Sequence, residues 1–212
     1  KYLKYIPPHI LYIIKVYLLG ILIFFIFRLI LFYTEINQIN VINNPFPLVL
    51  KAFYMGWRFD TVISCYIIFL PFLIFSILSF LGLYSKIILN VTKYIIISLF
   101  SLAFFICAVD IPFFNYYFSR LNVIIFSWTK NASFGFKMVI QEKTYLVYFF
   151  IFIVLNIIYI AIFRLIKIEP FKKGNGISNR IFHLFLSIIV LGVIFIGIRG
   201  RIEKKSPIRV GT

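Results

Sequence analysis

Residues 145–165 read YLVYFFIFIVLNIIYIAIFRL, and Arg164 is the only charged residue in this stretch. A helix of about 20 apolar residues crosses the roughly 30 Å hydrocarbon core of a bilayer. We therefore predict that this stretch is a transmembrane helix, and four further apolar runs predict four more. The predicted spans cover residues 10–33, 61–83, 93–114, 145–165 and 181–198.

The composition of the whole chain agrees with these spans. Of its 212 residues 63% are hydrophobic, 21% are aromatic and only 13% are charged, with a mean hydropathy of +1.04. Because soluble domains are about half apolar and a quarter charged, these values exclude a soluble globular domain. The net charge of +16 does not indicate nucleic acid as a partner, since Lys and Arg fall mainly between the apolar runs, where anionic headgroups would meet them.

The fold class that we predict is an all-α bundle of five transmembrane helices with interfacial helices on the outer face. Five spans place the two termini on opposite sides of the membrane. Loops on the N-terminal face are short and basic, notably residues 167–180, which predicts a cytoplasmic N-terminus and an extracytoplasmic C-terminus. The opposite face carries two longer segments, in which we expect residues 48–57 and 121–128 to form short helices in the headgroup layer.

The most informative polar stretch is Gly56-Trp57-Arg58-Phe59-Asp60, at the start of the second predicted span. One interpretation is a helix start, in which Asp60 complements the positive helix end, Trp57 anchors the interface and Arg58 reaches lipid phosphates. The other interpretation is a functional site on the outer face. It includes Asp110, because a carboxylate in the apolar zone costs about 3 kcal/mol and needs a cation such as Arg58 or Arg120.

The candidate site would contact an anionic lipid headgroup, a lipid-linked substrate or an outer domain. Its residues are Arg58, Asp60, Asp110, Arg120, Arg199 and Arg201. None of them is expected to be catalytic, since the sequence has no HExxH, P-loop, GxGxxG or GxSxG motif. We expect no metal or cofactor in this segment, and we interpret His9 and His183 as interfacial residues.

Several segments carry a resemblance to a known family. They are MGWRFD at 55–60, FNYYFSRLN at 114–122, RGR at 199–201 and SPIRVGT at 206–212. Together with the spans, they resemble the membrane region of the lipoteichoic acid synthase family. Members of this family are bacterial phosphoglycerol transferases and their relatives, which have a sulfatase-type outer domain.

The resemblance implies a five-helix domain in the bacterial cytoplasmic membrane that anchors an extracytoplasmic catalytic domain and presents lipid-linked substrate. Residues 199–212 would then begin the linker to that outer domain. The family's threonine nucleophile and divalent metal, commonly manganese, belong to the outer domain, and Thr212 is not assigned as that nucleophile. Two alternatives stay open: the membrane domain of a phosphoethanolamine transferase, and a small transporter or channel component.

Overall fold

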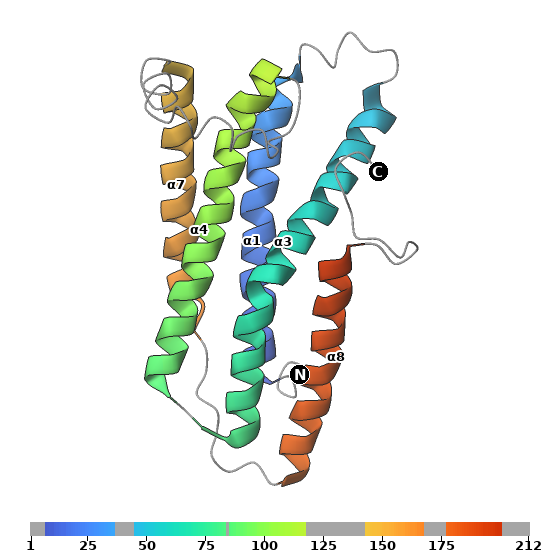
Figure 1. The fold of residues 1–212 in the computed structure, drawn as a ribbon, viewed down its shortest axis with the longest axis vertical. Helices are drawn as coiled ribbons and strands as arrows, with labels where there is room; N and C mark the ends of the chain where they lie inside the picture. Colours follow the sequence, from blue (N-terminus) through green and yellow to red (C-terminus); the bar gives the residue numbers. More distant parts are fainter. Residues whose placement is uncertain (1–6, 37–44, 84, 118–142, 168–176, 201–212) are drawn as a thin grey trace, which may run out of the picture.

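The computed structural model describes residues 7–36, 45–83, 85–117, 143–167 and 177–200. These ranges form helices and contain no strand. The helices are α1 (Pro8–Thr34), α3 (Pro45–Leu81), α4 (Lys86–Tyr117), α7 (Lys143–Leu165) and α8 (Ile177–Arg199) (Figure 1). Each of the five is long and apolar enough to cross a membrane. The prediction of an all-α bundle is confirmed, and the chain is a multi-pass membrane protein.

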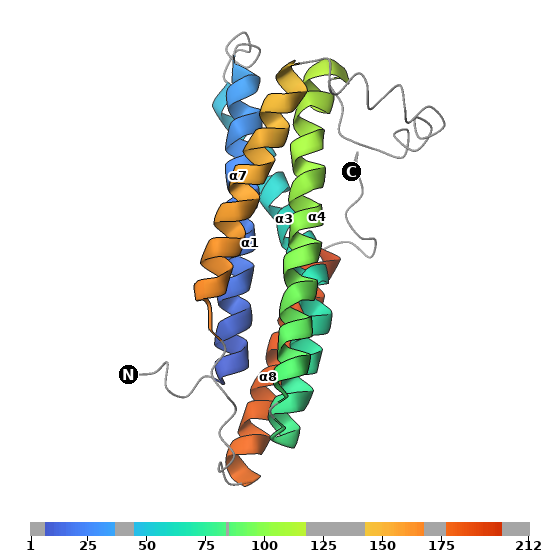
Figure 2. The same ribbon diagram turned by 90° about the vertical axis from the view of Figure 1, so that its left-hand side faces the viewer.

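Helix α1 lies at the centre of the bundle. It packs against α3, α4 and α7, whereas α8 packs mainly against α3 (Figures 1 and 2). Half of the most apolar stretch of α1 is buried inside the bundle, compared with 11% of the corresponding stretch of α8. The described helices therefore leave most of the surface of α8 uncovered, while α1 forms the core.

Aromatic side chains fill the contact between α1, α4 and α7. Phe104 of α4 meets Phe24 edge-on with 5.0 Å between ring centroids, and it meets Tyr159 of α7 edge-on at 5.1 Å. Such pairs contribute about 0.5 to 1.5 kcal/mol beyond the area they bury. Gly20 of α1 admits the fully buried ring of Phe100, because a Cβ atom at this position would overlap it.

Helix α3 differs from the prediction at its N-terminal end. Residues 48–57 are helical, as expected, but they continue directly into the second span instead of forming a separate interfacial helix. Pro45 and Pro47 stand in the first turn, where a missing N–H costs nothing, and Gly56 inside the helix costs only about 1 kcal/mol. The other predicted interfacial helix, at 121–128, lies outside the described residues.

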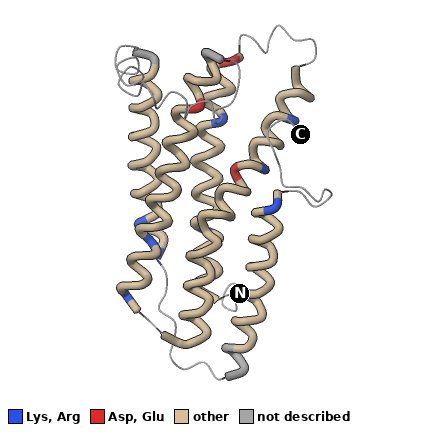
Figure 3. The backbone as a smooth tube through the Cα atoms, viewed as in Figure 1, with Lys and Arg blue, Asp and Glu red and all other residues tan. Residues whose placement is uncertain are grey.

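The direction of α3 changes about halfway along its length, so that its N-terminal half leans away from α1 (Figure 1). Pro71 lies inside the helix and offers no N–H to the carbonyl one turn earlier, which is the usual cause of such a bend. Helix α8 lies beside the C-terminal half of α3 and ends partway along it. The acidic residues drawn in Figure 3 all lie in the upper half of the view, where α3 begins.

Candidate functional site

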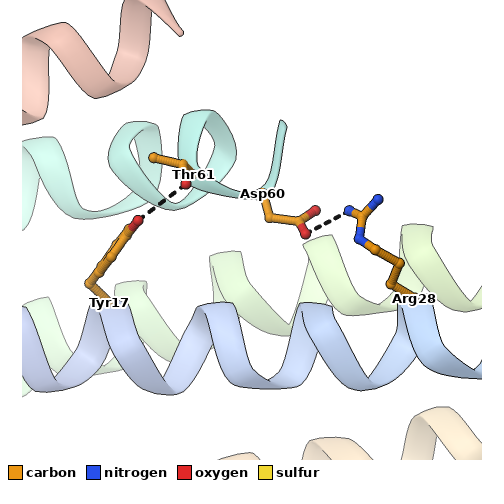
Figure 4. A network of polar contacts seen from close by, with 4 residues as sticks. All are labelled: Tyr17, Arg28, Asp60 and Thr61. Atoms are coloured by element: carbon orange, nitrogen blue, oxygen red, sulfur yellow. Dashed lines mark hydrogen bonds and ion pairs between the residues drawn. The ribbon is translucent and has the colours of Figure 1, made fainter. Parts of the chain in front are cut away.

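An ion pair joins α1 to α3 inside the bundle. Arg28 Nη2 donates a hydrogen bond to Asp60 Oδ2 over 2.6 Å (Figure 4). The two side chains are only 14% and 11% exposed. Removal of one partner of a buried pair leaves an uncompensated charge and typically costs about 3 to 5 kcal/mol. The pair therefore holds the middle of α3 against α1.

A second polar contact lies on the next residue of α3. The hydroxyls of Tyr17 and Thr61 are 3.1 Å apart, within hydrogen-bonding distance (Figure 4). Tyr17 and Arg28 are about three helical turns apart on α1, yet they reach adjacent residues of α3. Rotation of α3, or its translation along α1, would break at least one of the two contacts.

Gly56 makes the ion pair sterically possible. A Cβ atom on Gly56 would overlap the guanidinium of Arg28, so only glycine leaves room for this group beside α3. Asp60 lies well inside α3, which begins at Pro45, and the interpretation of Asp60 as a helix-start residue is therefore wrong. Within the 56–60 stretch, Gly56 leaves space for the Arg28 guanidinium and Asp60 forms the ion pair with it.

Arg58 points to the end of α8. Its Nε and Nη2 donate to the carbonyl oxygen of Gly200 over 3.2 and 2.6 Å, and its guanidinium lies 5.6 Å from the centre of the Tyr54 ring. Gly200 has a φ of 67°, the left-handed conformation that ends many helices and favours glycine. Because carbonyls at a helix C-terminus carry partial negative charge, a cation here stabilises the end of α8.

The predicted site residues are only partly brought together. Arg58 and Asp60 lie at the junction of α1, α3 and α8, and Arg199 is the last residue of α8, next to Gly200. Asp110 lies half-buried in α4, and its pairing with Arg58 or Arg120 stays a prediction. Arg120 and Arg201 lie outside the described residues.

The sequence prediction missed Arg28. This arginine sits inside the first apolar run, where a cation is expensive and is normally paired or faces a polar cavity. The expectation that a cation inside a span is paired could have led from Arg28 to Asp60, the acid near the start of the second span. The sequence alone does not show which residues of two antiparallel helices lie at the same level.

A groove lies between α1 and the N-terminal part of α3, and we name it the α1–α3 groove. Its volume is about 560 Å³, within the range of roughly 300 to 1,000 Å³ that is usual for ligand pockets. Arg28 and Asp60 are part of its wall. The rest of its wall is mainly apolar and includes Leu18, Leu22, Phe25, Leu50, Tyr54 and Trp57.

Asn115 of α4 joins this helix to the C-terminal end of α1. In the amide orientation that satisfies both ends of the side chain, its nitrogen donates to Glu35 Oε1 over 2.7 Å and to the Ile111 carbonyl over 3.1 Å. Asn115 belongs to the 114–122 stretch that carries part of the family resemblance. This stretch thus begins on the same side of the bundle as the start of α3.

His9 lies in the first turn of α1 and is fully buried, and its interpretation as an interfacial residue stays a prediction. Ser187 of α8 donates to the His183 carbonyl over 2.8 Å, and His9 Nε2 lies 2.9 Å from the same hydroxyl. Because the serine proton is already used, His9 Nε2 is the donor in this contact. The bond ties the middle of α8 to the N-terminal end of α1.

The described part of the chain contains no group of three or more His, Cys, Asp or Glu side chains that could hold a metal ion. Comparisons with protein-family models, curated proteins and solved structures find no match for this chain. The geometry of the helices and the residues that carry the resemblance are therefore the basis for a functional proposal.

Proposed function

We propose that the chain is the membrane domain of a sulfatase-type phosphoglycerol transferase of the lipoteichoic acid synthase kind. It would lie in the bacterial cytoplasmic membrane with a cytoplasmic N-terminus and an extracytoplasmic C-terminus. The membrane domain would anchor the catalytic domain and present a lipid-linked substrate at the outer leaflet. The divalent metal, expected to be manganese, would be bound by the catalytic domain.

The contact between Arg58 and Gly200 carries this proposal. Two of the stretches that resemble the family, 55–60 and 199–201, are far apart in the sequence but meet at this hydrogen bond. Arg58 holds the end of the last helix, from which a linker to an outer domain would depart. The α1–α3 groove begins on the other side of the same stretch, at Trp57 and Asp60. One short segment therefore lies between the end of α8 and the α1–α3 groove, which supports the proposal that it connects the linker to a lipid site.

The proposal is tested by the product of the complete reading frame. Coding sequence beyond Thr212 should encode a sulfatase-type domain with a threonine nucleophile. The purified full product should transfer glycerol phosphate from a fluorescent phosphatidylglycerol in the presence of manganese, and chelation should abolish the transfer. The 212-residue chain alone should turn over nothing. Manganese-dependent turnover by this chain alone, or a reading frame that lacks such a domain, would contradict the proposal.

A phosphoethanolamine transferase is the alternative within the same superfamily. The same assay separates the two, because the transferred group would come from phosphatidylethanolamine and not from phosphatidylglycerol.

A transporter is the alternative from another class, and the Arg28–Asp60 pair inside the spans is the observation that favours it. Charged residues within spans often mark ion or substrate pathways. A solute flux in liposomes that disappears on neutralisation of both residues would support this alternative.

A further inference from the structure

We propose that two copies of this chain associate in the membrane through α7, with the Asn156 side chains of the two copies bonded to each other at the centre of the interface. This surface is distinct from the α1–α3 groove and from the contacts of Arg58, so the association is independent of the proposed function. Two features lead to it: an amide in the hydrocarbon layer that one copy satisfies only in part, and the symmetry of two copies in one membrane.

A polar contact joins α4 to α7 in the middle of the spans. Ser101 Oγ donates a hydrogen bond to Asn156 Oδ1 over 2.8 Å. Asn156 lies one residue from the midpoint of the span Tyr145–Leu165, and Ser101 lies at the midpoint of the span Lys86–Asn115. Since the hydrocarbon core is about 30 Å thick, the lipid headgroups lie roughly 15 Å from this contact. Neither headgroup oxygens nor bulk water are therefore at hand to bind the amide.

The Asn156 amide has more hydrogen-bonding capacity than this contact uses. An asparagine side chain offers two N–H donors and an oxygen with two lone pairs. Ser101 uses one lone pair, and within the described helices the amide nitrogen has no hydrogen-bond partner. With the amide turned over, the nitrogen would donate to Ser101 and the oxygen would lack a donor instead. Because an unsatisfied polar group in hydrocarbon is costly, we expect its partner on a second protein surface.

The amide lies where another helix can reach it. Asn156 itself is only half-buried. Phe149 and Ile153, two turns and one turn earlier on the same side of α7, are 49% and 37% exposed, and Phe105, one turn after Ser101 on α4, is 41% exposed. Only 22% of the most apolar stretch of α7 is buried, and the other described helices lie behind α4 and α7 in Figure 2. The amide is thus a polar point within an exposed apolar surface.

A second copy of the chain presents the complementary group at the matching depth. Copies that are inserted in the same direction are related by a twofold axis normal to the membrane, and this axis leaves the depth of every residue unchanged. The two α7 helices are then parallel, and the two Asn156 side chains lie at the same level. Each amide nitrogen can donate to the oxygen of the other amide, so that two hydrogen bonds satisfy both copies.

Energy transfer between copies measures the association. The 212-residue chain is labelled at its C-terminus with a donor or an acceptor dye, and both forms are reconstituted together in phosphatidylcholine vesicles at decreasing protein-to-lipid ratios. Transfer should exceed the value for randomly placed molecules and should fall along a monomer–dimer curve on dilution. Asn156→Leu should move the midpoint of this curve to about tenfold higher protein density, the value of two interhelical hydrogen bonds in a membrane.

Ser101→Ala is the matched control. It removes the same hydrogen bond inside one copy, but it leaves the amide groups that pair between copies. The midpoint of its dilution curve should therefore stay at the parent value. Circular dichroism of both variants in the same vesicles shows whether the helices are intact.

Disulfide crosslinking locates the interface. In a chain with Cys65→Ala and Cys107→Ala, a single Ile153→Cys should crosslink two copies, because Ile153 lies one turn from Asn156 on the same side of α7. Ile188→Cys on α8 is the control, since Ile188 is 58% exposed but belongs to another helix, and it should not crosslink.

Transfer at the random value for the native chain at every density would overturn the inference and would indicate a different membrane protein as the partner of the amide. Equal crosslinking at residues 153 and 188 would overturn it as well, as would a midpoint that Asn156→Leu leaves unchanged. If Asn156→Leu loses its helical content, the crosslink at residue 153 decides, because that chain keeps both Asn156 and Ser101.

Discussion

Replacement of Gly56 by alanine should destabilise the bundle, although alanine is the better helix former. The new Cβ atom would occupy the position of the Arg28 guanidinium and would force it away from Asp60. Loss of a buried ion pair costs about 3 to 5 kcal/mol, while glycine to alanine inside a helix gains about 1 kcal/mol. The expected net loss in the free energy of unfolding is therefore about 2 to 4 kcal/mol.

The matched control is Gly192→Ala. Gly192 lies inside α8, and a Cβ atom there would meet nothing within 4 Å. This control should gain up to about 1 kcal/mol, so that the two glycine substitutions change stability in opposite directions. Unfolding by sodium dodecyl sulfate in mixed micelles, followed by circular dichroism, measures both values.

A third variant isolates the cause. In a background with Arg28→Met and Asp60→Leu, no guanidinium occupies the space beside Gly56, and replacement of a buried ion pair by apolar groups is often neutral. The Gly56→Ala substitution should then lose its cost. If it is stabilising in the native background, or equally costly in both backgrounds, the role assigned to the ion pair is incorrect.

The remaining predictions concern other contacts of the bundle. Arg58→Ala should lose about 1.5 to 3 kcal/mol of hydrogen bonding to Gly200, and amide exchange in the last turn of α8 should become faster; unchanged exchange would show that this contact does not hold the helix end. Gly20→Ala should destabilise the bundle by about 1 to 3 kcal/mol in the same micelle assay, because the buried Phe100 ring cannot move aside, and a stable variant would refute this packing. Asp110→Ala should lower the melting temperature in detergent more than Asp110→Asn, since the amide keeps one hydrogen bond. A proton flux in liposomes that disappears in a fully stable Asp110→Asn would instead favour the transporter alternative.

The sequence predicts the existence and the number of the spans well. A run of about 20 apolar residues is long enough to cross the hydrocarbon core, and a helix satisfies all of its backbone hydrogen bonds there. The sequence predicts the ends of the spans less well. Helix α3 begins 16 residues before the predicted span, at Pro45 instead of residue 61, since two prolines in a first turn permit a helix as readily as they interrupt one. Composition marks the part of a helix that lies in hydrocarbon, and a helix does not have to stop at the edge of that layer.

The candidate site was only partly predictable. The sequence indicates Arg58 and Asp60 as site residues because charged side chains at the start of a span require polar partners. The structure provides a partner for each of them. Those partners, Arg28 and the Gly200 carbonyl, depend on the register between helices and on the bend in α3. Neither the register nor the bend can be derived from hydrophobic periodicity. The sequence also does not show which backbone carbonyl accepts a hydrogen bond from a side chain.

The most direct test of the proposed arrangement is the sidedness of the membrane domain in intact bacterial cells. Single cysteines are placed at residues 172–176, between α7 and α8, and at Lys204, after α8, and are exposed to an impermeant thiol reagent. The wild-type chain, with Cys65 and Cys107, gives the background labelling. Labelling at Lys204 together with protection at 172–176 is the expected result, because an outer catalytic domain has to follow α8 on the extracytoplasmic side. Labelling at 172–176 with protection at Lys204 would contradict both the orientation and the anchoring role.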